Sequence, residues 1–268
     1  MKRKIPYFLA LLILLGVMTL AGYKVLTILG EYRTEEDTSQ ELQQFIQLPP
    51  AESPQPEPFV PDATEPEPVP GETEPEPTED PTVYPEVDFK SLQEINPDVI
   101  GWIYIEDTKI NYPIVQGVDN SRYMYTTADG RRNAAGSIFM DFRNEPDFSE
   151  RHTILYGHNM RNGAMFAGIR NYMDPEFAAE HPIGLIMTPE KNFRFEVIGG
   201  YIAKTTDPAW RIHYDSDEDF AAWLRDTMDR STVECNAAPQ EGDRILTLST
   251  CTYEIKNGRF VLICRILP

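Results

Sequence analysis

RILTLSTC, at residues 244–251, is an alternating run that ends in a cysteine, and GRFVLICRIL follows at residues 258–267 after a short polar loop. Both runs are rich in apolar and β-branched residues, which is typical of β-strands. Because the side chains of a strand alternate between its two faces, Cys251 shares a face with Thr247 and Ser249. The cysteine therefore ends the more polar face of its strand, where a substrate can reach it.

From residue 87 onward the sequence predicts mainly short strands. Two of them, Val99–Ile105 and Lys109–Gln116, are separated by a polar triplet and form a predicted hairpin. The remaining predicted strands are 136–141, 153–158, 183–188, 192–199, 244–251 and 259–267. Many short strands and few helices indicate a mainly β fold, either a barrel or a sandwich.

Two helices are predicted alongside these strands. The first is Phe89–Asn96, with Asp88 as its N-cap and Pro97 as the residue that stops it. The second covers about Asp217–Arg230, and its acidic beginning and basic end suit the helix dipole. Its apolar side chains recur on one face, as packing onto a barrel requires.

Residues 1–30 have the composition of a membrane anchor. Basic residues at 2–4 precede an uncharged stretch, residues 5–23. As a helix this stretch covers about 28 Å, close to the ~30 Å hydrocarbon thickness of a bilayer. It is longer than the core of a secretory signal peptide, and the basic cluster favours an N-terminus inside the cell. We therefore expect an uncleaved signal anchor rather than a cleaved signal, and a domain on the extracellular face of the cell membrane.

Residues 31–86 are expected to connect this anchor to the folded domain. A short juxtamembrane helix is expected within 31–48. Residues 49–86 are rich in Pro and Glu and carry eleven acidic residues and no basic one. Such a segment has too few apolar residues for a core and favours extended geometry, so we expect a disordered spacer. The ordered domain is expected to begin near Val87 and to span 87–268.

Cysteine usage and charge exclude several classes of protein. The chain has three cysteines, so at least one thiol has no partner within the chain. Cys264 alternates with apolar residues and is expected in the core, whereas Cys235 is expected in a loop and accessible there. No CxxC or HExxH spacing occurs, so neither structural zinc nor zincin chemistry is expected. A formal charge of −19 repels phosphate backbones, so nucleic acid is not an expected partner.

One of the four histidines is a candidate catalytic group. His158 follows a glycine at the end of an apolar strand, a place where loops build sites. The other three have ordinary structural interpretations: His152 at a strand edge, His181 in a turn, and His213 in a loop or at a strand edge.

An arginine supplies the third candidate group. Arg259 begins the strand that follows the cysteine strand, and Arg265 lies on the same face about 20 Å farther from the connecting loop. A guanidinium stays charged and offers several donors to a developing oxyanion. A thiol, an imidazole and a fixed cation near strand ends are what a thiol acyl-transferase needs.

These residues resemble the sortases, in which a TLxTC motif carries the cysteine, a Gly-His pair the histidine, and the next strand an arginine. The resemblance covers about residues 90–268 and looks most like class B, on TLSTCTYE at 247–254 and YPIVQGVDN at 112–120. It implies an eight-stranded β-barrel with an N-terminal helix and a further helix in the insertion before the cysteine strand.

The resemblance also implies a function, that of a membrane-anchored cysteine transpeptidase without cofactor or metal. Cys251 attacks the Thr carbonyl in the C-terminal sorting motif of an exported protein, while Arg259 stabilises the oxyanion. His158 protonates the departing amine, and an amine of the peptidoglycan precursor then resolves the thioester. The residues expected to line the peptide groove are Ser249, Asn120 and Met124.

Three alternatives are weighed against this interpretation. A papain-like hydrolase requires a helix-borne cysteine that precedes its histidine, the reverse of the order here. A pilin-polymerising sortase uses a lysine acceptor and usually adds a C-terminal hydrophobic segment, whereas this sequence stops at Pro268. A membrane-tethered β-domain that binds a surface ligand, with an incidental thiol, is the alternative outside the enzymes.

Overall fold

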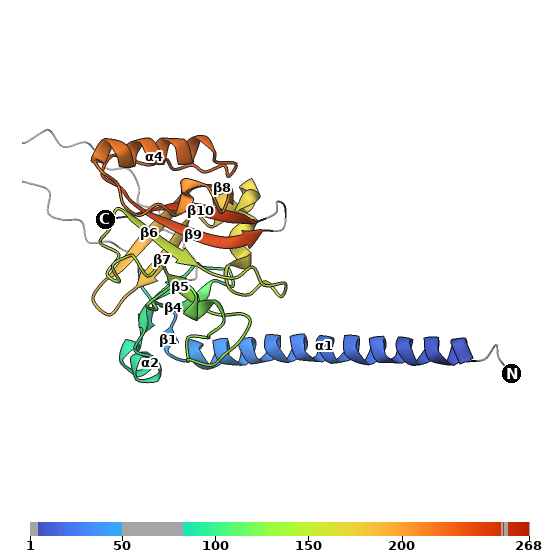
Figure 1. Ribbon diagram of the computed structural model, residues 1–268. Coiled ribbons are helices and arrows are strands. Elements are labelled where there is room, and N and C mark those ends of the chain that lie inside the picture. The colour runs from blue at the N-terminus through green and yellow to red at the C-terminus, as the bar shows by residue number, and fades with distance from the viewer. Residues whose placement is uncertain (1–4, 50–82, 253, 255–256, 268) are drawn as a thin grey trace, which may run out of the picture.

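A closed β-barrel forms the body of the computed structural model, which describes residues 5–49, 83–252, 254 and 257–267. The barrel strands are β3 (Val99–Tyr104), β4 (Asn111–Val115), β5 (Ile138–Met140), β6 (His152–Tyr156), β7 (Ile183–Met187), β8 (Asn192–Lys204), β9 (Arg244–Thr252) and β10 (Gly258–Ile266). Around the barrel their order is β10-β8-β7-β3-β4-β5-β6-β9. Figure 1 shows the barrel from the side, with α1 extending away from it. The pairs β4–β5 and β6–β9 are parallel, and the other pairs are antiparallel. The expected eight-stranded barrel is confirmed.

Helices and one small sheet surround the barrel. They are α1 (Ile5–Gln43), β1 (Ile46–Gln47), β2 (Glu86–Val87), α2 (Phe89–Ile95), α3 (Pro175–Glu180), α4 (Asp217–Asp229) and the 3-10 helices η1 (Arg122–Met124), η2 (Phe166–Met173) and η3 (Pro208–Trp210). The predicted helices appear as α2 and α4, and the Asp88 side chain caps α2 by accepting a hydrogen bond from the Ser91 amide at 3.0 Å. The helices η2 and α3 were not predicted from the sequence.

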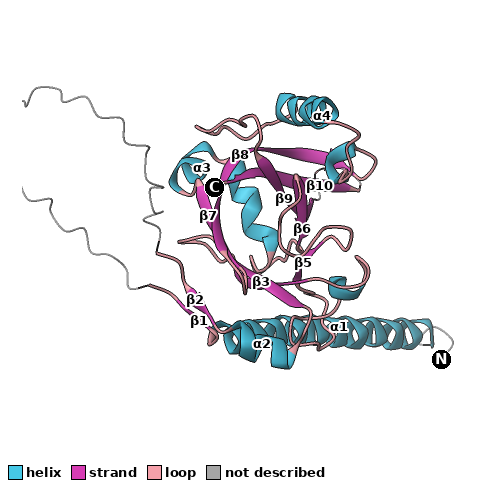
Figure 2. Cartoon of the chain, turned by 90° about the vertical axis from the view of Figure 1, so that its left-hand side faces the viewer, coloured by secondary structure: helices cyan, strands magenta, loops and turns pink. Residues whose placement is uncertain are grey.

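Three apolar clusters hold these elements together. The largest fills the barrel, where η2 contributes the buried side chains of Phe166, Ile169 and Tyr172. A second lies between the barrel wall and the elements α1 and α2, and a third lies beneath α4. Figure 2 shows α4 on one side of the barrel and α1 with α2 on the opposite side. Cys264 is fully buried in the barrel interior, as predicted.

The N-terminal helix α1 continues past the predicted membrane anchor and reaches the barrel. α1 is one continuous helix, and it is long and apolar enough over part of its length to cross a membrane. Its C-terminal part packs on the barrel through Leu42, and Arg131 donates hydrogen bonds at 2.9 Å to Thr38 and to Glu41. The prediction that ordered structure begins near Val87 was therefore wrong, because the charged part of α1 already belongs to the folded domain.

The connection between β1 and β2 also bears on the expected spacer. Residues 50–82, which make up most of it, lie outside the described residues. On either side of them, Ile46 pairs with Val87 and Gln47 pairs with Glu86 in an antiparallel ladder. Through this pairing, and through the packing of Leu42 and Ile46, the end of α1 and the strand β1 lie against the rest of the folded domain.

His152 is the first residue of β6, so its predicted place at a strand edge and its structural role are confirmed, and its side chain is fully buried. Its Nδ1 lies 2.6 Å from the carbonyl oxygen of Arg211, so this nitrogen donates, and Nε2 accepts from the Thr247 hydroxyl at 2.8 Å. Both ring nitrogens of the neutral imidazole therefore have a hydrogen-bond partner. Burial lowers the pKa of His152 from 6.5 to about 4.

This burial makes stability depend on pH in a defined window. In the unfolded state the His152 imidazole binds a proton below about pH 6.5. In the folded state it binds that proton only below about pH 4. The stabilisation is therefore complete above pH 6.5, and roughly 3 kcal/mol is lost as the pH falls toward 4. Urea unfolding at about pH 7 and about pH 4.5 measures this loss.

The variant His152→Gln cannot titrate, so its smaller free energy of unfolding should change much less between the two pH values. His213→Gln, at an exposed position, should behave like the wild type. An equal loss in wild type and His152→Gln would contradict the assignment.

Candidate active site

All six residues that the sequence analysis assigned to the site lie in one cleft of about 250 Å³. The residues that line it are Asn120, Met124, Phe139, Tyr156, Gly157, His158, Ser249, Thr250, Cys251 and Arg259. They come from the β4–β5 connection, from β5, from the end of β6 and the loop that follows it, and from the adjoining ends of β9 and β10. Phe139 and Tyr156 were not predicted to line the cleft. In the sequence they look like ordinary aromatic residues of core strands.

Strand register brings Cys251 and Arg259 together. The two residues are direct partners across the antiparallel β9–β10 ladder. Side chains of such a pair lie on the same face, with Cβ atoms about 5 Å apart. Arg259 is half-buried, and its Nη1 donates to the Gly258 carbonyl at 3.0 Å, which leaves other guanidinium donors for the cleft. Arg265, the rival candidate, is instead held by Glu196 at 2.7 Å at the other end of β10.

A glycine at the end of β6 lets His158 enter the cleft. A Cβ atom at Gly157 would lie 2.5 Å from Ile138 and 2.7 Å from Phe166, so no larger residue fits between them. His158 Nε2 lies 2.8 Å from the Met124 carbonyl oxygen. Because a carbonyl only accepts, Nε2 carries a proton, and Nδ1 is the nitrogen left for proton exchange.

The loop that begins at His158 is also tied to the cysteine strand. Asn159 Nδ2 donates to the Cys251 carbonyl at 2.9 Å, and the Gly157 amide donates to the Ser249 carbonyl at 3.1 Å. These two bonds fix the position of the imidazole relative to the thiol. Asn159 was not predicted, because a single asparagine after Gly-His has no distinctive sequence pattern.

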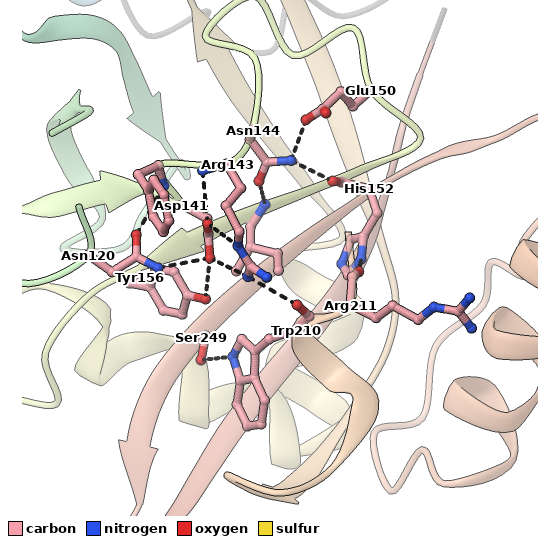
Figure 3. Close-up of polar contacts among 12 residues, drawn as sticks. Asn120, Asp141, Arg143, Asn144, Glu150, His152, Tyr156, Trp210, Arg211 and Ser249 are labelled. Atoms are coloured by element: carbon pink, nitrogen blue, oxygen red, sulfur yellow. Dashed lines mark hydrogen bonds and ion pairs between the residues drawn. The ribbon is translucent and has the colours of Figure 1, made fainter. Parts of the chain in front are cut away.

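The predicted groove residues are held by hydrogen bonds from neighbouring segments (Figure 3). The Ser249 hydroxyl accepts from the Trp210 indole at 3.2 Å. The Asn120 side chain donates to Asp141 at 3.0 Å and accepts from the Phe142 amide at 3.0 Å. Met124 lines the cleft and provides the carbonyl that holds His158.

The three cysteines differ in environment. Cys251 is partly exposed in the cleft. Cys235 lies in a loop, as predicted, but it is half-buried against the barrel core, and this burial raises the pKa of its thiol to about 11. Burial also raises the pKa of Cys264 well above its usual value. A thiolate is therefore disfavoured at both positions outside the cleft.

Burial also affects Tyr156, another candidate proton donor in the cleft. Burial and the nearby Asp141 carboxylate raise the pKa of its phenol, and the hydroxyl donates to Asp141 at 2.9 Å. Tyr156 is therefore a fixed neutral donor, and the imidazole of His158 is the better proton carrier. Among the described residues, no group of three or more His, Cys, Asp and Glu side chains is placed to hold a metal ion.

Comparison with known proteins gives the same fold and places the chain in a family. Residues 103–266 match the sortase domain model. The chain is 36% identical over 177 residues to sortase B of Listeria monocytogenes (strain EGD-e), covering 65% of this chain and 72% of that protein. It is 34% identical over 181 residues to sortase B of Staphylococcus aureus (strain NCTC 8325), covering 67% and 74%. The solved Staphylococcus aureus sortase B–substrate complex has a TM-score of 0.63 at 34% identity, covering 67% of this chain and 84% of that one.

A barrel of this topology with a thiol at one strand end is the architecture of a cysteine transpeptidase, and this chain belongs to the sortase family. Within the family it is of class B, in agreement with both relatives and with the helix α4 inserted before the cysteine strand. The resemblance on TLSTC and Gly-His is thus confirmed.

Proposed function

We propose that this transpeptidase cleaves a C-terminal sorting motif of exported proteins after Thr and joins them to an amine of the cell-wall peptidoglycan precursor. The observation that carries the proposal is the single cleft that contains Cys251, His158 and Arg259 beside the three groove residues. The similar Staphylococcus aureus sortase B has been solved as a substrate complex, and this supports the proposal.

The mechanism follows from the positions of the three groups. The thiolate of Cys251 attacks the Thr carbonyl carbon, and the guanidinium of Arg259 donates to the oxygen as it becomes negative. His158 gives a proton to the departing amine, so that the peptide bond breaks and a thioester forms. The acceptor amine then attacks the thioester carbonyl and His158 takes the proton that the amine loses. The carbon–sulfur bond breaks, a new amide forms, and Cys251 leaves as the thiolate, which restores the starting state.

The N-terminal helix supports a location at the cell membrane. We infer a single-pass anchor with the N-terminus inside, from the apolar stretch of α1 and the basic residues before it. The Cys251 end of β9 lies on the side of the barrel toward which α1 extends (Figure 1). A lipid-linked amine acceptor at the membrane surface would approach from that side.

An experiment with the full chain in detergent tests this function and names the motif. The protein is incubated with a library of sorting-type pentapeptides extended at the C-terminus, and intact mass detects an acyl adduct on Cys251. Addition of an oligoglycine or diaminopimelate-type amine should release the adduct as a new amide. Release only by a lysine side chain of a pilin-type peptide would replace wall anchoring by pilin polymerisation. No adduct from a folded protein with any peptide would favour a ligand-binding domain.

A further inference from the structure

A buried carboxylate next to the cleft connects several segments that are far apart in the sequence. Asp141 has no exposed surface and follows β5 directly. It accepts hydrogen bonds from Asn120 at 3.0 Å, from Tyr156 at 2.9 Å and from both Nε and Nη2 of Arg143 at 2.8 Å. Figure 3 shows this carboxylate at the centre of the network. Burial alone would raise the pKa of Asp141, but these donors lower it overall, so the group is ionised.

The first connection runs to the β4–β5 segment that lines the cleft. Asn120 is held at both ends of its amide, because Nδ2 donates to Asp141 and Oδ1 accepts from the Phe142 amide at 3.0 Å. An amide nitrogen has two protons, and only one of them is used by Asp141. The other proton can therefore be offered to a carbonyl oxygen of a peptide in the cleft.

The second connection runs through Arg143 to the insertion between β8 and α4. Nη2 of Arg143 donates to the Trp210 carbonyl at 3.2 Å, and buried His152 holds the next carbonyl, that of Arg211, at 2.6 Å. Side chains of the barrel thus hold two consecutive backbone carbonyls of the insertion by hydrogen bonds. The Trp210 indole in turn donates to the Ser249 hydroxyl at 3.2 Å.

This last bond decides what Ser249 can do. An indole N–H is only a donor, so the Ser249 oxygen is the acceptor and the hydroxyl proton remains for another partner. Trp210 also lines a hollow next to the cleft, and the two depressions share Tyr156 and Arg259. Ser249 lines the cleft, and its hydroxyl proton is therefore available to a peptide bound there.

We propose that Asp141 is a positioning residue: through Asn120, and through Arg143 and Trp210, it orients two hydrogen-bond donors toward the backbone carbonyls of the substrate peptide. The inference deepens the proposed function and rests on it. A carboxylate that positions donors affects peptide binding, whereas the distance from thiol to imidazole is set by the separate bonds of Asn159 and Gly157.

The test compares Asp141→Asn with a matched ion pair elsewhere on the barrel. In the full chain, Asp141→Asn should raise KM for the sorting peptide about tenfold and change kcat less than about twofold, because peptide hydrogen bonds weaken while the reacting groups stay in place. Glu196→Gln breaks the partly buried Glu196–Arg265 pair, 2.7 Å long, at the other end of β10. It should lower the melting temperature and leave KM unchanged.

Two further variants separate positioning from loss of folding. Arg143→Lys keeps the positive charge but not the paired geometry, so it should raise KM even if Asp141→Asn does not fold. Trp210→Phe removes only the indole donor and should raise KM with little change in melting temperature. A fall in melting temperature with unchanged KM in Asp141→Asn, Arg143→Lys and Trp210→Phe would overturn the proposal.

A readout without turnover keeps the test independent of the assigned activity. Amide hydrogen exchange should increase at 118–124 and 208–214 in Asp141→Asn and not in Glu196→Gln. If no peptide is acylated by the wild type, the proposed function fails, and the exchange result still decides whether Asp141 fixes both segments. Exchange that rises equally in both variants would show that Asp141 has a general structural role.

Discussion

Cys251→Ala should abolish acyl transfer, with turnover of a sorting peptide reduced by about 10⁴-fold or more and no adduct detectable by intact mass. The expectation follows from the chemistry, because without a nucleophile no thioester forms and only uncatalysed hydrolysis remains. The Cys251 side chain is partly exposed in the cleft, so its removal leaves no cavity in the barrel core. The melting temperature should therefore stay close to that of the wild type.

The other two thiols provide the controls for this variant. Cys235→Ala should keep turnover within about twofold, since the pKa of this half-buried thiol is raised to about 11 and it lies outside the cleft. Cys264→Ala removes a fully buried side chain, so it should lower stability and leave the acylation rate of the folded protein unchanged. An adduct that persists in Cys251→Ala and disappears in Cys235→Ala would show that the nucleophile has been misassigned.

The strands that carry the site were predictable from alternation. In β10, Phe260, Leu262 and Cys264 fall in the barrel interior, while Val261 and Ile263 pack beneath α4, as a period of two requires. Apolar runs of this kind specify strands locally, and the observed strand ends differ from the predicted ones by a few residues at most, except that β8 extends to Lys204.

The helices outside that pattern were harder to predict. Residues 31–43 are polar and highly charged, which is typical of an exposed juxtamembrane helix, yet they bury Glu35 and Thr38 against the barrel. η2 is eight residues long and follows a residue at positive φ, Met165. A segment of that length is too short to show helical periodicity, although it contributes large side chains to the barrel core.

The residues of the candidate site likewise fall into two groups, those that could be predicted from the sequence and those that could not. Cys251, His158 and Arg259 have short motifs around them, so their positions could be read from the sequence. Asp141 and Trp210 have none, because the contacts that matter join residues 21 and 39 positions apart, Asn120 with Asp141 and Trp210 with Ser249. Only the closed barrel brings such residues together. Sequence motifs thus predict the groups that are proposed to react, and the fold is needed to find the groups that are proposed to orient them.

Arg259 provides the second large effect. Arg259→Lys should lower the acylation rate at saturating peptide by about 10²-fold, and Arg259→Met by about 10³-fold, the usual cost of losing an oxyanion donor. A lysine keeps the charge, but its ammonium is a hydrated point charge on a flexible chain and does not reproduce the planar donor set. Because Arg259 is the direct cross-strand partner of Cys251, no other guanidinium of the β9–β10 pair can take its place.

Arg265→Lys is the matched control, since it lies on the same strand face but pairs with Glu196. It should change stability and leave the acylation rate as in the wild type. Single-turnover measurement with intact-mass detection separates this rate from peptide affinity. If Arg259→Lys weakened only affinity and acylated at the wild-type rate at saturation, Arg259 would be a peptide-binding residue. The oxyanion would then need backbone donors at the end of β9, and the motif arginine would contribute to recognition rather than to the chemical step.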